Sequence, residues 1–298
     1  MNFLKNLFET IVKFFGMTKI LSNVKNIAIV LLAFYFSGTQ FNAVSFFLGI
    51  VSLSSIFSAV YVYNNISDFY IDKKNNEKKH YSESVEYFGK KNAFTIFFIL
   101  VVISFLLALF INIYFLTTLI VLFIAGIMYS SPAIRFKEKF LLDFLFGATF
   151  TYLLRFISAW FIFSISFPPI LPILALISAK TGGYILYKQG DAQFLKSLGV
   201  KNTATIIKKK ETIIFSIFLW IITFISVFFL FINAKYLNIK ILGSLPLKFL
   251  ILSPFAIPPL AVIYLYTLGA LKMSIKNLRI LGFIYWLSFI IVFWLFFL

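Results

Sequence analysis

The stretch Asn64-Asn65-Ile66-Ser67-Asp68-Phe69-Tyr70-Ile71-Asp72 ends a long apolar run and places an amide and two carboxylates at spacings of four. Steps of four residues drift only about 40° around an α-helix, so Asn64, Asp68 and Asp72 share one face over roughly two turns. Mg2+ is commonly held by one or two carboxylates together with substrate phosphates. The pattern therefore predicts a metal and diphosphate site that includes these three side chains.

The composition identifies the class of protein. Of 298 residues, 61% are hydrophobic and 20% aromatic, and the charged fraction of 12% is about half the usual value for soluble proteins. We expect an all-α, polytopic membrane protein. In a soluble protein, Asp68 and Asp72 would be interpreted as part of a solvated helix end. Where a span meets the membrane surface, ionisable groups are costly, and function is the default interpretation.

Cysteine and histidine content excludes several kinds of site. The chain has no cysteine, which excludes disulfides and thiolate metal sites, and its single histidine, His80, excludes a multi-histidine centre. The net charge of +17 is compatible with nucleic-acid binding. The lysines, however, fall in short loops between apolar runs, which is typical of positive-inside membrane topology. We expect no nucleic-acid partner.

The apolar runs predict nine transmembrane helices around a central cavity. Residues 1–16 have apolar residues at helical spacing and predict an interfacial amphipathic helix; a signal peptide is the alternative, but no small-residue cleavage site follows. Residues 17–298 form one transmembrane domain. Its spans are expected at 24–38, 41–68, 92–111, 114–131, 140–165, 170–187, 212–232, 249–268 and 280–298.

Basic residues predict the orientation of these spans. Most of the 27 lysines and arginines, including Lys272, fall on the side of the N-terminus, and all ten acidic residues lie there or at its helix ends. The positive-inside rule predicts an N-in, C-out topology. We expect a multi-pass protein of the cell membrane whose active site faces the cytoplasm.

Two segments resemble a known family. The NxxxDxxxD pattern of Asn64, Asp68 and Asp72 resembles the first aspartate-rich motif of the UbiA superfamily of intramembrane prenyltransferases. The stretch from Tyr129 to Lys137, YSSPAIRFK, is similar to the YSxPxxRxK segment of that family. A tyrosine hydroxyl with Arg135 and Lys137 could bind diphosphate oxygens through charge-assisted hydrogen bonds. A basic membrane anchor is the alternative for this segment.

A third segment resembles the second family motif, DxxxDxxxGxxxT. Asp191, Gly199 and Thr203 match, whereas Leu195 stands at the second aspartate position. The resemblance implies that Asp191 is a further metal ligand, with Gln193 or water replacing part of the lost coordination. Asp191 as a plain helix-end residue is the alternative. The loss of one carboxylate puts a second metal ion in doubt.

Other charged residues have less specific signals. The resemblance suggests diphosphate contacts for Lys25, before the first span, and Lys79, in the loop after Asp72, and we add Lys188 at the end of the sixth span. Arg155 lies near mid-membrane, where an unpaired cation is expensive. We expect it to reach a carbonyl, a polar cavity or a carboxylate on another helix. Asp143 is about 18 Å away along the same helix and cannot pair with it.

The resemblance implies a function. It is the Mg2+-dependent transfer of an isoprenyl group from an isoprenyl diphosphate donor to an aromatic or lipid-alcohol acceptor within the membrane, in lipid biosynthesis, with Asp68, Asp72 and Asp191 as catalytic residues. One alternative is an enzyme similar to the polyprenyl-phosphate phosphoribosyltransferases. Another is a transporter or a catalytically inactive lipid-binding protein. The acceptor, the isoprenyl chain length and the oligomeric state have no signature in the sequence.

Overall fold

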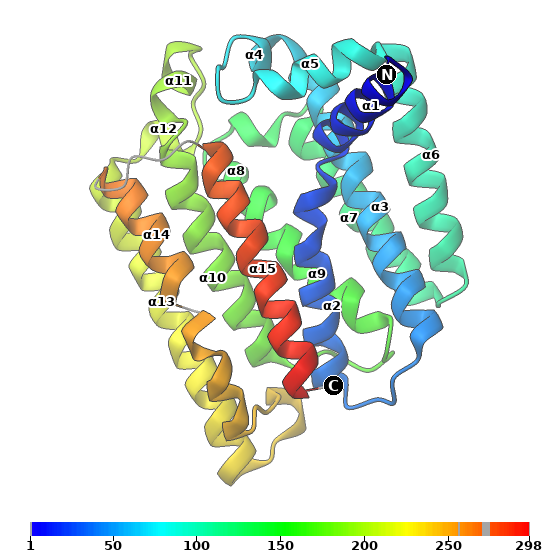
Figure 1. Cartoon of the computed structure of the whole chain (residues 1–298). Helices are drawn as coiled ribbons and strands as arrows, with labels where there is room; N and C mark the ends of the chain where they lie inside the picture. Colours follow the sequence, from blue (N-terminus) through cyan, green and yellow to red (C-terminus); the bar gives the residue numbers. More distant parts are fainter. Residues whose placement is uncertain (1, 256, 270–274, 298) are drawn as a thin grey trace.

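The computed structural model describes residues 2–255, 257–269 and 275–297, and in this part of the chain all regular elements are helices joined by turns and loops (Figure 1). Its elements are α1 (Asn2–Thr18), η1 (Ile20–Asn23), α2 (Val24–Ser37), α3 (Ala43–Ser67), α4 (Phe69–Lys73), α5 (Lys79–Phe88), α6 (Lys90–Leu109), α7 (Ile113–Ser130), η2 (Phe136–Glu138), α8 (Leu142–Phe144), η3 (Leu145–Thr149), α9 (Phe150–Phe161), α10 (Ile170–Gln189), α11 (Ala192–Ser197), α12 (Thr203–Ile206), α13 (Lys209–Ile232), η4 (Asn233–Leu237), η5 (Lys240–Leu242), η6 (Leu247–Phe255), α14 (Ile257–Leu268) and α15 (Ile275–Phe297).

Eight helical stretches in the described part of the chain are long and apolar enough to cross a membrane. They are built on α2, α3, α6, α7, α8 to α9, α10, α13 and α15. The protein is therefore a multi-pass membrane protein, as the composition predicted. The first span begins at Ile20, earlier than expected, because η1 runs into α2.

The expected span at 249–268 has a different structure. The 3-10 helix η6 and the 12-residue helix α14 cover it, and neither is long enough to cross a membrane alone. The sequence places prolines at 254, 258 and 259, and a proline inside a helix removes a backbone donor and clashes with the preceding turn. The count of nine spans and the N-in, C-out orientation stay predictions. Residues 270–274, which include Lys272, and Leu298 lie outside the described residues.

Asparagine caps and a left-handed glycine set the helix ends far from the motifs. Gly38 ends α2 with φ 62°, a conformation that favours glycine. Asn42 and Asn112 start α3 and α7, each side chain accepting a hydrogen bond from the backbone three residues on. The Asn112 side chain also donates to the carbonyl of Phe161, at 2.6 Å. These contacts join α7 to the end of α9.

The spans pack through small polar residues as well as apolar ones. Ser52 on α3 and Ser104 on α6 each donate to the other's carbonyl, both at 2.8 Å, and both are fully buried. A methyl group added at Gly49 or Gly126 would collide with a branched side chain of a neighbouring helix. Small residues and inter-helix hydrogen bonds are the usual means of close packing in membranes.

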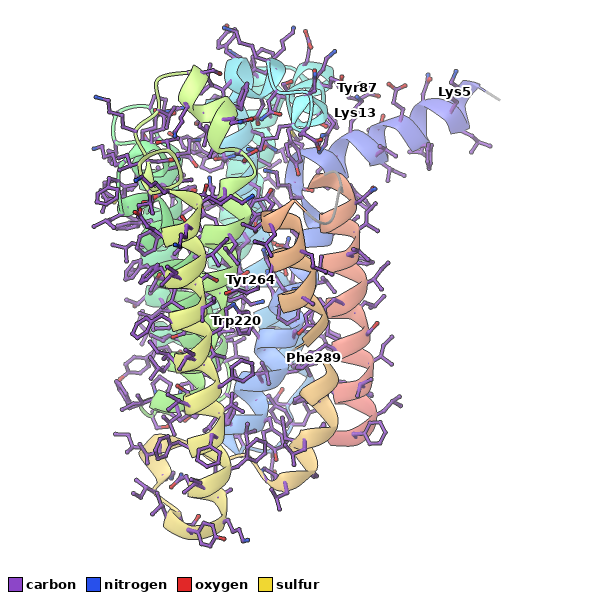
Figure 2. All side chains as sticks on the ribbon, turned by 90° about the vertical axis from the view of Figure 1, so that its left-hand side faces the viewer. Lys5, Lys13, Tyr87, Trp220, Tyr264 and Phe289 are labelled. Carbon is purple, nitrogen blue, oxygen red and sulfur yellow. The ribbon has the colours of Figure 1, made fainter. Side chains whose placement is uncertain are left out.

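The two ends of the bundle differ. Figure 1 shows α1, α4, α5, α11 and α12 gathered at the end that holds the N-terminus, and the C-terminus at the other end. Helix α1 projects from the body, with Lys5 near its free end and Lys13 where it meets α5 (Figure 2). Lys13 pairs there with Glu83, at 3.3 Å. The exposed Leu4, Phe8 and Phe15 agree with the amphipathic helix expected over residues 1–16, although its interfacial location stays a prediction.

Candidate active site

The first motif keeps its shared face across a break in the helix. Helix α3 ends at Ser67, and Asp68, with φ −96° and ψ 5°, separates it from α4. The backbone nitrogen of Asp68 still donates to the carbonyl of Asn64, at 2.9 Å, and that of Asp72 to the carbonyl of Asp68, at 2.8 Å. Asp68 and Asp72 are 8% and 6% exposed. The spacing of four therefore brings both carboxylates into one buried site.

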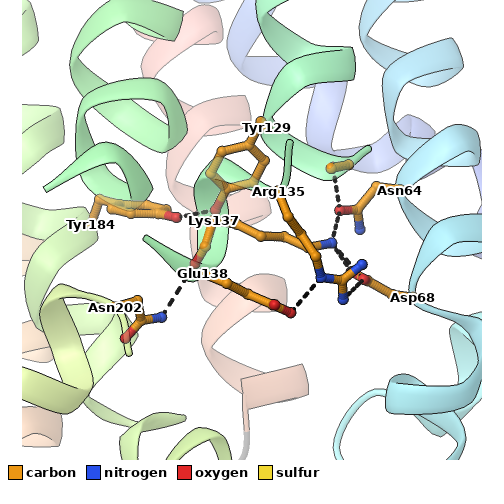
Figure 3. A network of polar contacts seen from close by, with 9 residues as sticks. Asn64, Asp68, Tyr129, Arg135, Lys137, Glu138, Tyr184 and Asn202 are labelled. Carbon is orange, nitrogen blue, oxygen red and sulfur yellow. Dashed lines mark hydrogen bonds and ion pairs between the residues drawn. The ribbon is translucent and has the colours of Figure 1, made fainter. Parts of the chain in front are cut away.

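The segment after α7 returns its cations to Asp68 (Figure 3). The Lys137 Nζ lies 2.5 Å from the Asp68 carboxylate and 3.2 Å from Oδ1 of Asn64. The Arg135 guanidinium contacts Asp68 at 3.2 Å and Glu138 at 2.5 Å. Arg135 has φ 52°, an uncommon backbone conformation outside glycine that often marks functional sites. Arg135 and Lys137, predicted from the second resembling segment, thus converge on the first motif.

Burial shifts two of these groups toward their neutral forms. Burial, and then the negative charge of Asp68, raise the pKa of Asp72 to about 6. Burial also lowers the pKa of the Lys137 ammonium, although Asp68 opposes this shift. Perturbed carboxyl and ammonium groups facing one cavity are typical of functional sites.

The second motif reaches the same site through α11, although Asp191 itself, just before α11, is not among the residues that line the cavity. Asp191 is 4% exposed and forms an ion pair with Lys78, at 2.6 Å. Lys79, the predicted contact, is exposed on the first turn of α5, so its neighbour Lys78 is the lysine that reaches the site. Leu195 lines the cavity, whereas Gln193 is exposed and does not line it. The position at which the second motif lacks its carboxylate therefore lies on the cavity that also holds Asp68 and Asp72.

An open cavity joins the two motifs. It has about 490 Å³ of empty space, including the solvent at its mouth. Its polar lining comes from the two motif regions and the segment between them: Asp68, Asp72, Asn75, Lys78, Arg135, Lys137, Glu138, Lys188 and Asn202. Apolar side chains of α11 and of the loop after it, Leu195 among them, close the other side. A lining that combines carboxylates with four cationic side chains suits a metal-bound anion.

The donor types fit Mg2+ in company with a phosphate ligand. Asp68, Asp72 and the amide oxygen of Asn64 are oxygen donors, and substrate phosphates and water commonly complete the shell of this ion. Within residues 2–255, 257–269 and 275–297, no three acidic, histidine or cysteine side chains lie close enough to hold an ion together. Asp191 is held by Lys78 instead. The single set of Asn64, Asp68, Asp72 and Asp191 is therefore not assembled in this conformation.

Several contacts that hold the site were not predicted. The Thr203 hydroxyl of the second motif donates to Asp143 and accepts from the backbone nitrogen of Leu141, at 2.8 Å. The Asn202 side chain donates to the carbonyl of Lys137, at 3.3 Å (Figure 3). Gly199, with φ 73°, turns the chain after α11 so that these residues can return. Asn202 and Thr203 thus tie the end of the second motif to Lys137 and to the start of α8.

Of the remaining predicted residues, two lie at the cavity and two lie away from it. Tyr129 lies beside the site, its hydroxyl 2.5 Å from that of Tyr184 (Figure 3), and Lys188 lines the cavity. The Lys25 Nζ instead lies 3.4 Å from the Tyr61 hydroxyl, on the membrane side of the cavity. Arg155 was expected to meet a carbonyl, a polar cavity or a carboxylate. Its guanidinium lies against the rings of Phe57 on α3 and Tyr152, one turn earlier on α9 itself, at 3.7 and 4.6 Å.

Comparisons with known proteins identify the family and the fold of the chain. The sequence profile of the UbiA prenyltransferase family matches residues 26–253. Similar solved structures include a UbiA homologue from Archaeoglobus fulgidus bound to GPP and Mg2+, with a TM-score of 0.73, 20% identity, and coverage of 94% of this chain and 97% of that one. An apo UbiA homologue from Aeropyrum pernix K1 has a TM-score of 0.72 and 18% identity, covering 92% and 98%. A structure of a digeranylgeranylglyceryl phosphate synthase matches with a TM-score of 0.65 and 19% identity, covering 95% of this chain and 98% of that one. No curated protein matches the chain.

Proposed function

Because the chain belongs to the UbiA prenyltransferase family, we propose that it transfers an isoprenyl group from an isoprenyl diphosphate to a lipophilic acceptor within the membrane, with Mg2+ as cofactor. The observation that carries the proposal is one cavity in which Asp68 and Asp72 face Lys137, Arg135 and Lys188. Structures of the Archaeoglobus fulgidus homologue contain GPP or DMAPP together with Mg2+, which supports the same donor class and cation here.

The residues of the cavity have complementary tasks. Asp68 and Asp72, with the amide oxygen of Asn64, would hold Mg2+, which supplies positive charge against the leaving diphosphate. Arg135, Lys137 and Lys188 would bind diphosphate oxygens by charge-assisted hydrogen bonds. These contacts strengthen as the allylic carbon-oxygen bond breaks, because the leaving group gains negative charge while the isoprenyl carbon becomes positive.

Asp68 and Asp191 change partners in this proposal. Each is paired with a lysine in the structure, at 2.5 Å from Lys137 and 2.6 Å from Lys78. A divalent ion would take over the carboxylates, and the two ammonium groups would become free to bind the diphosphate. Asp191 then joins the metal shell directly or through water, which makes Asp68, Asp72 and Asp191 the residues on which turnover depends. The lysines thus keep the carboxylates neutralised before the substrate arrives.

The location of the enzyme belongs to the same proposal. We place the end of the bundle that carries α4, α5 and α11 (Figure 1) in the cytoplasm of a cell bearing the protein in its cell membrane. The abundance of lysine in the loops of that end supports this orientation. The isoprenyl tail would extend from the cavity into the apolar bundle.

The test is turnover by purified protein. The protein is incubated with labelled isoprenyl diphosphates of several lengths and a panel of aromatic and lipid-alcohol acceptors, with Mg2+ or with EDTA. We expect a prenylated product that needs the metal and is lost in Asp68→Asn and Asp72→Asn. Glu9→Gln, a matched change on the exposed face of α1, should keep the activity. Lipid binding without any metal-dependent product would instead support a transporter or a lipid-binding protein.

A further inference from the structure

Three cationic side chains surround one tyrosine inside the spans. The Lys25 Nζ, the Arg155 Cζ and the Lys180 Nζ lie 6.0, 4.6 and 5.6 Å from the ring centroid of Tyr152. They come from α2, α9 and α10, which are far apart in the sequence. All three belong to stretches that are long and apolar enough to cross a membrane. The fold therefore concentrates positive charge in the apolar part of the bundle.

None of the carboxylates in the described residues forms an ion pair with this cluster. The ten acidic residues of the sequence are Glu9, Asp68, Asp72, Glu77, Glu83, Glu86, Glu138, Asp143, Asp191 and Glu211. Two of them lie in a spanning stretch. Asp143 is the second residue of its stretch and Glu211 is the third residue of its own. No ion pair of the described residues includes Lys25, Arg155 or Lys180. Three cations in a low-dielectric region are costly without a counter-charge, and a bound anion would supply one.

Arg155 also has unused hydrogen-bond donors. It is 1% exposed, and its Nε and Nη1 have no hydrogen-bond partner. The aromatic rings of Phe57 and Tyr152 contact the guanidinium, but a ring face does not take the in-plane N–H groups. A buried guanidinium with free donors is the usual arrangement for binding a planar or tetrahedral oxyanion.

We infer that Lys25, Arg155 and Lys180 form a second anion site, which binds a phosphate monoester on the acceptor lipid. A phosphate monoester carries a charge between −1.5 and −2 at pH 7 and three acceptor oxygens. Three cations, with the Tyr61 hydroxyl beside Lys25, match that number of acceptors and offset the whole charge of the monoester. A carboxylate would neutralise only one of the three cations. The inference rests on the proposed function, because it identifies the acceptor of that reaction.

This site is distinct from the one that would hold the donor diphosphate. Tyr61 precedes Asp68 by seven residues, which is about 10 Å along α3. Lys180 precedes Lys188 by eight residues, about 12 Å along α10. Lys25, Arg155 and Lys180 do not line the cavity that holds Asp68 and Asp72. Lys25, expected from the sequence to bind the donor, is thereby assigned to the acceptor. The acceptor's anionic group would sit deeper in the bundle than the donor's.

Binding measurements without turnover test the inference. Purified protein in EDTA is titrated with farnesyl phosphate, with farnesol and with inorganic phosphate. We expect farnesyl phosphate to bind about tenfold or more tightly than either of the others, since only it offers both the charge and the tail. Arg155→Gln and Lys180→Met should each weaken it by about tenfold or more, the loss expected for one charge-assisted hydrogen bond.

A crossed comparison separates the two sites. Lys137→Gln should weaken Mg2+-dependent binding of geranyl diphosphate and leave farnesyl phosphate binding within about twofold of wild type. Arg155→Gln should weaken farnesyl phosphate binding and leave geranyl diphosphate binding within about twofold of wild type. If Lys137→Gln weakens farnesyl phosphate and Arg155→Gln does not, the monoester binds in the donor cavity and the inference is overturned. Absence of Mg2+-dependent geranyl diphosphate binding in wild type would count against the proposed function alone.

Thermal stability distinguishes ligand binding from a structural role. Methionine has the length of lysine without its charge, and it suits an apolar surrounding. If Lys180 serves an external anion, Lys180→Met should unfold at the same or a higher temperature than wild type without ligand, and should lose the stabilisation that farnesyl phosphate gives wild type. A fall of the unfolding temperature without ligand, with ligand stabilisation retained, would show that the ammonium group is structural. This readout also stands if Arg155→Gln fails to fold.

Discussion

Acidification should release a divalent cation from the candidate site through Asp72. A carboxylate must lose its proton before it coordinates a metal, so cation affinity follows its ionised fraction. Burial and the charge of Asp68 raise the pKa of Asp72 to about 6. The ionised fraction is then about 0.9 at pH 7 and about 0.1 at pH 5, and the apparent affinity falls about tenfold, or ~1.4 kcal/mol.

The same shift acts on folding in the opposite direction. The pKa of Asp72 in the folded protein, about 6, lies above the ordinary value of 3.8. Its contribution to stability is therefore fully present below the ordinary value and is lost as the pH rises through about 6. The metal-free protein should gain up to about 3 kcal/mol from this group between pH 7 and pH 3. Metal affinity and metal-free stability thus depend on pH with opposite signs.

Mn2+ in place of Mg2+ allows the affinity to be measured by electron paramagnetic resonance of the free ion, since both cations prefer oxygen ligands. The titrations run from pH 5 to pH 8 without phosphate compounds, whose second ionisation falls near pH 6. Asp72→Asn should bind more weakly and lose the pH dependence. His80→Gln, at an exposed position near the start of α5, controls for the single histidine. An affinity that stays constant from pH 7 to pH 5, or an equal slope in Asp72→Asn, would refute the reasoning.

Three further predictions follow from the placement of the second motif and from the basic loops. Leu195→Asp should tighten Mg2+ binding about tenfold by titration, because Leu195 lines the cavity, whereas Gln193→Asp, which adds the same charge at an exposed position, should not; equal effects would mean that charge alone matters. Thr203→Val should lower the unfolding free energy by about 1–3 kcal/mol in denaturant titrations, because it removes the hydroxyl donor of the buried Asp143; an unchanged stability would mean that this contact is weak. In this cysteine-free chain, Lys201→Cys should react with an impermeant thiol reagent from the cytoplasmic side and Lys240→Cys from outside; labelling of both from one side would overturn the orientation.

Local patterns in the sequence were sufficient for the class and the first motif. Apolar runs separated by short basic loops predicted a multi-pass helical membrane protein, because the length and polarity of a span are properties of consecutive residues. The spacing of Asn64, Asp68 and Asp72 placed both carboxylates in one buried site, since backbone hydrogen bonds four residues apart continue through the break at Asp68. The prolines in 249–268 were visible in the sequence, and they explain why no single long helix covers that segment.

Tertiary structure decided which side chains meet. The pairs Lys78 with Asp191 and Lys137 with Asp68 join residues 113 and 69 positions apart, and no local pattern selects Lys78 over the adjacent Lys79. The rotation of the first turn of α5 makes that choice by exposing Lys79. The gathering of Lys25, Arg155 and Lys180 around Tyr152 likewise depends on how α2, α9 and α10 pack. The sequence determined which charged side chains lie in the apolar spans and that their burial is costly. Which side chains surround them depends on helix packing, and therefore on contacts between residues far apart in the sequence.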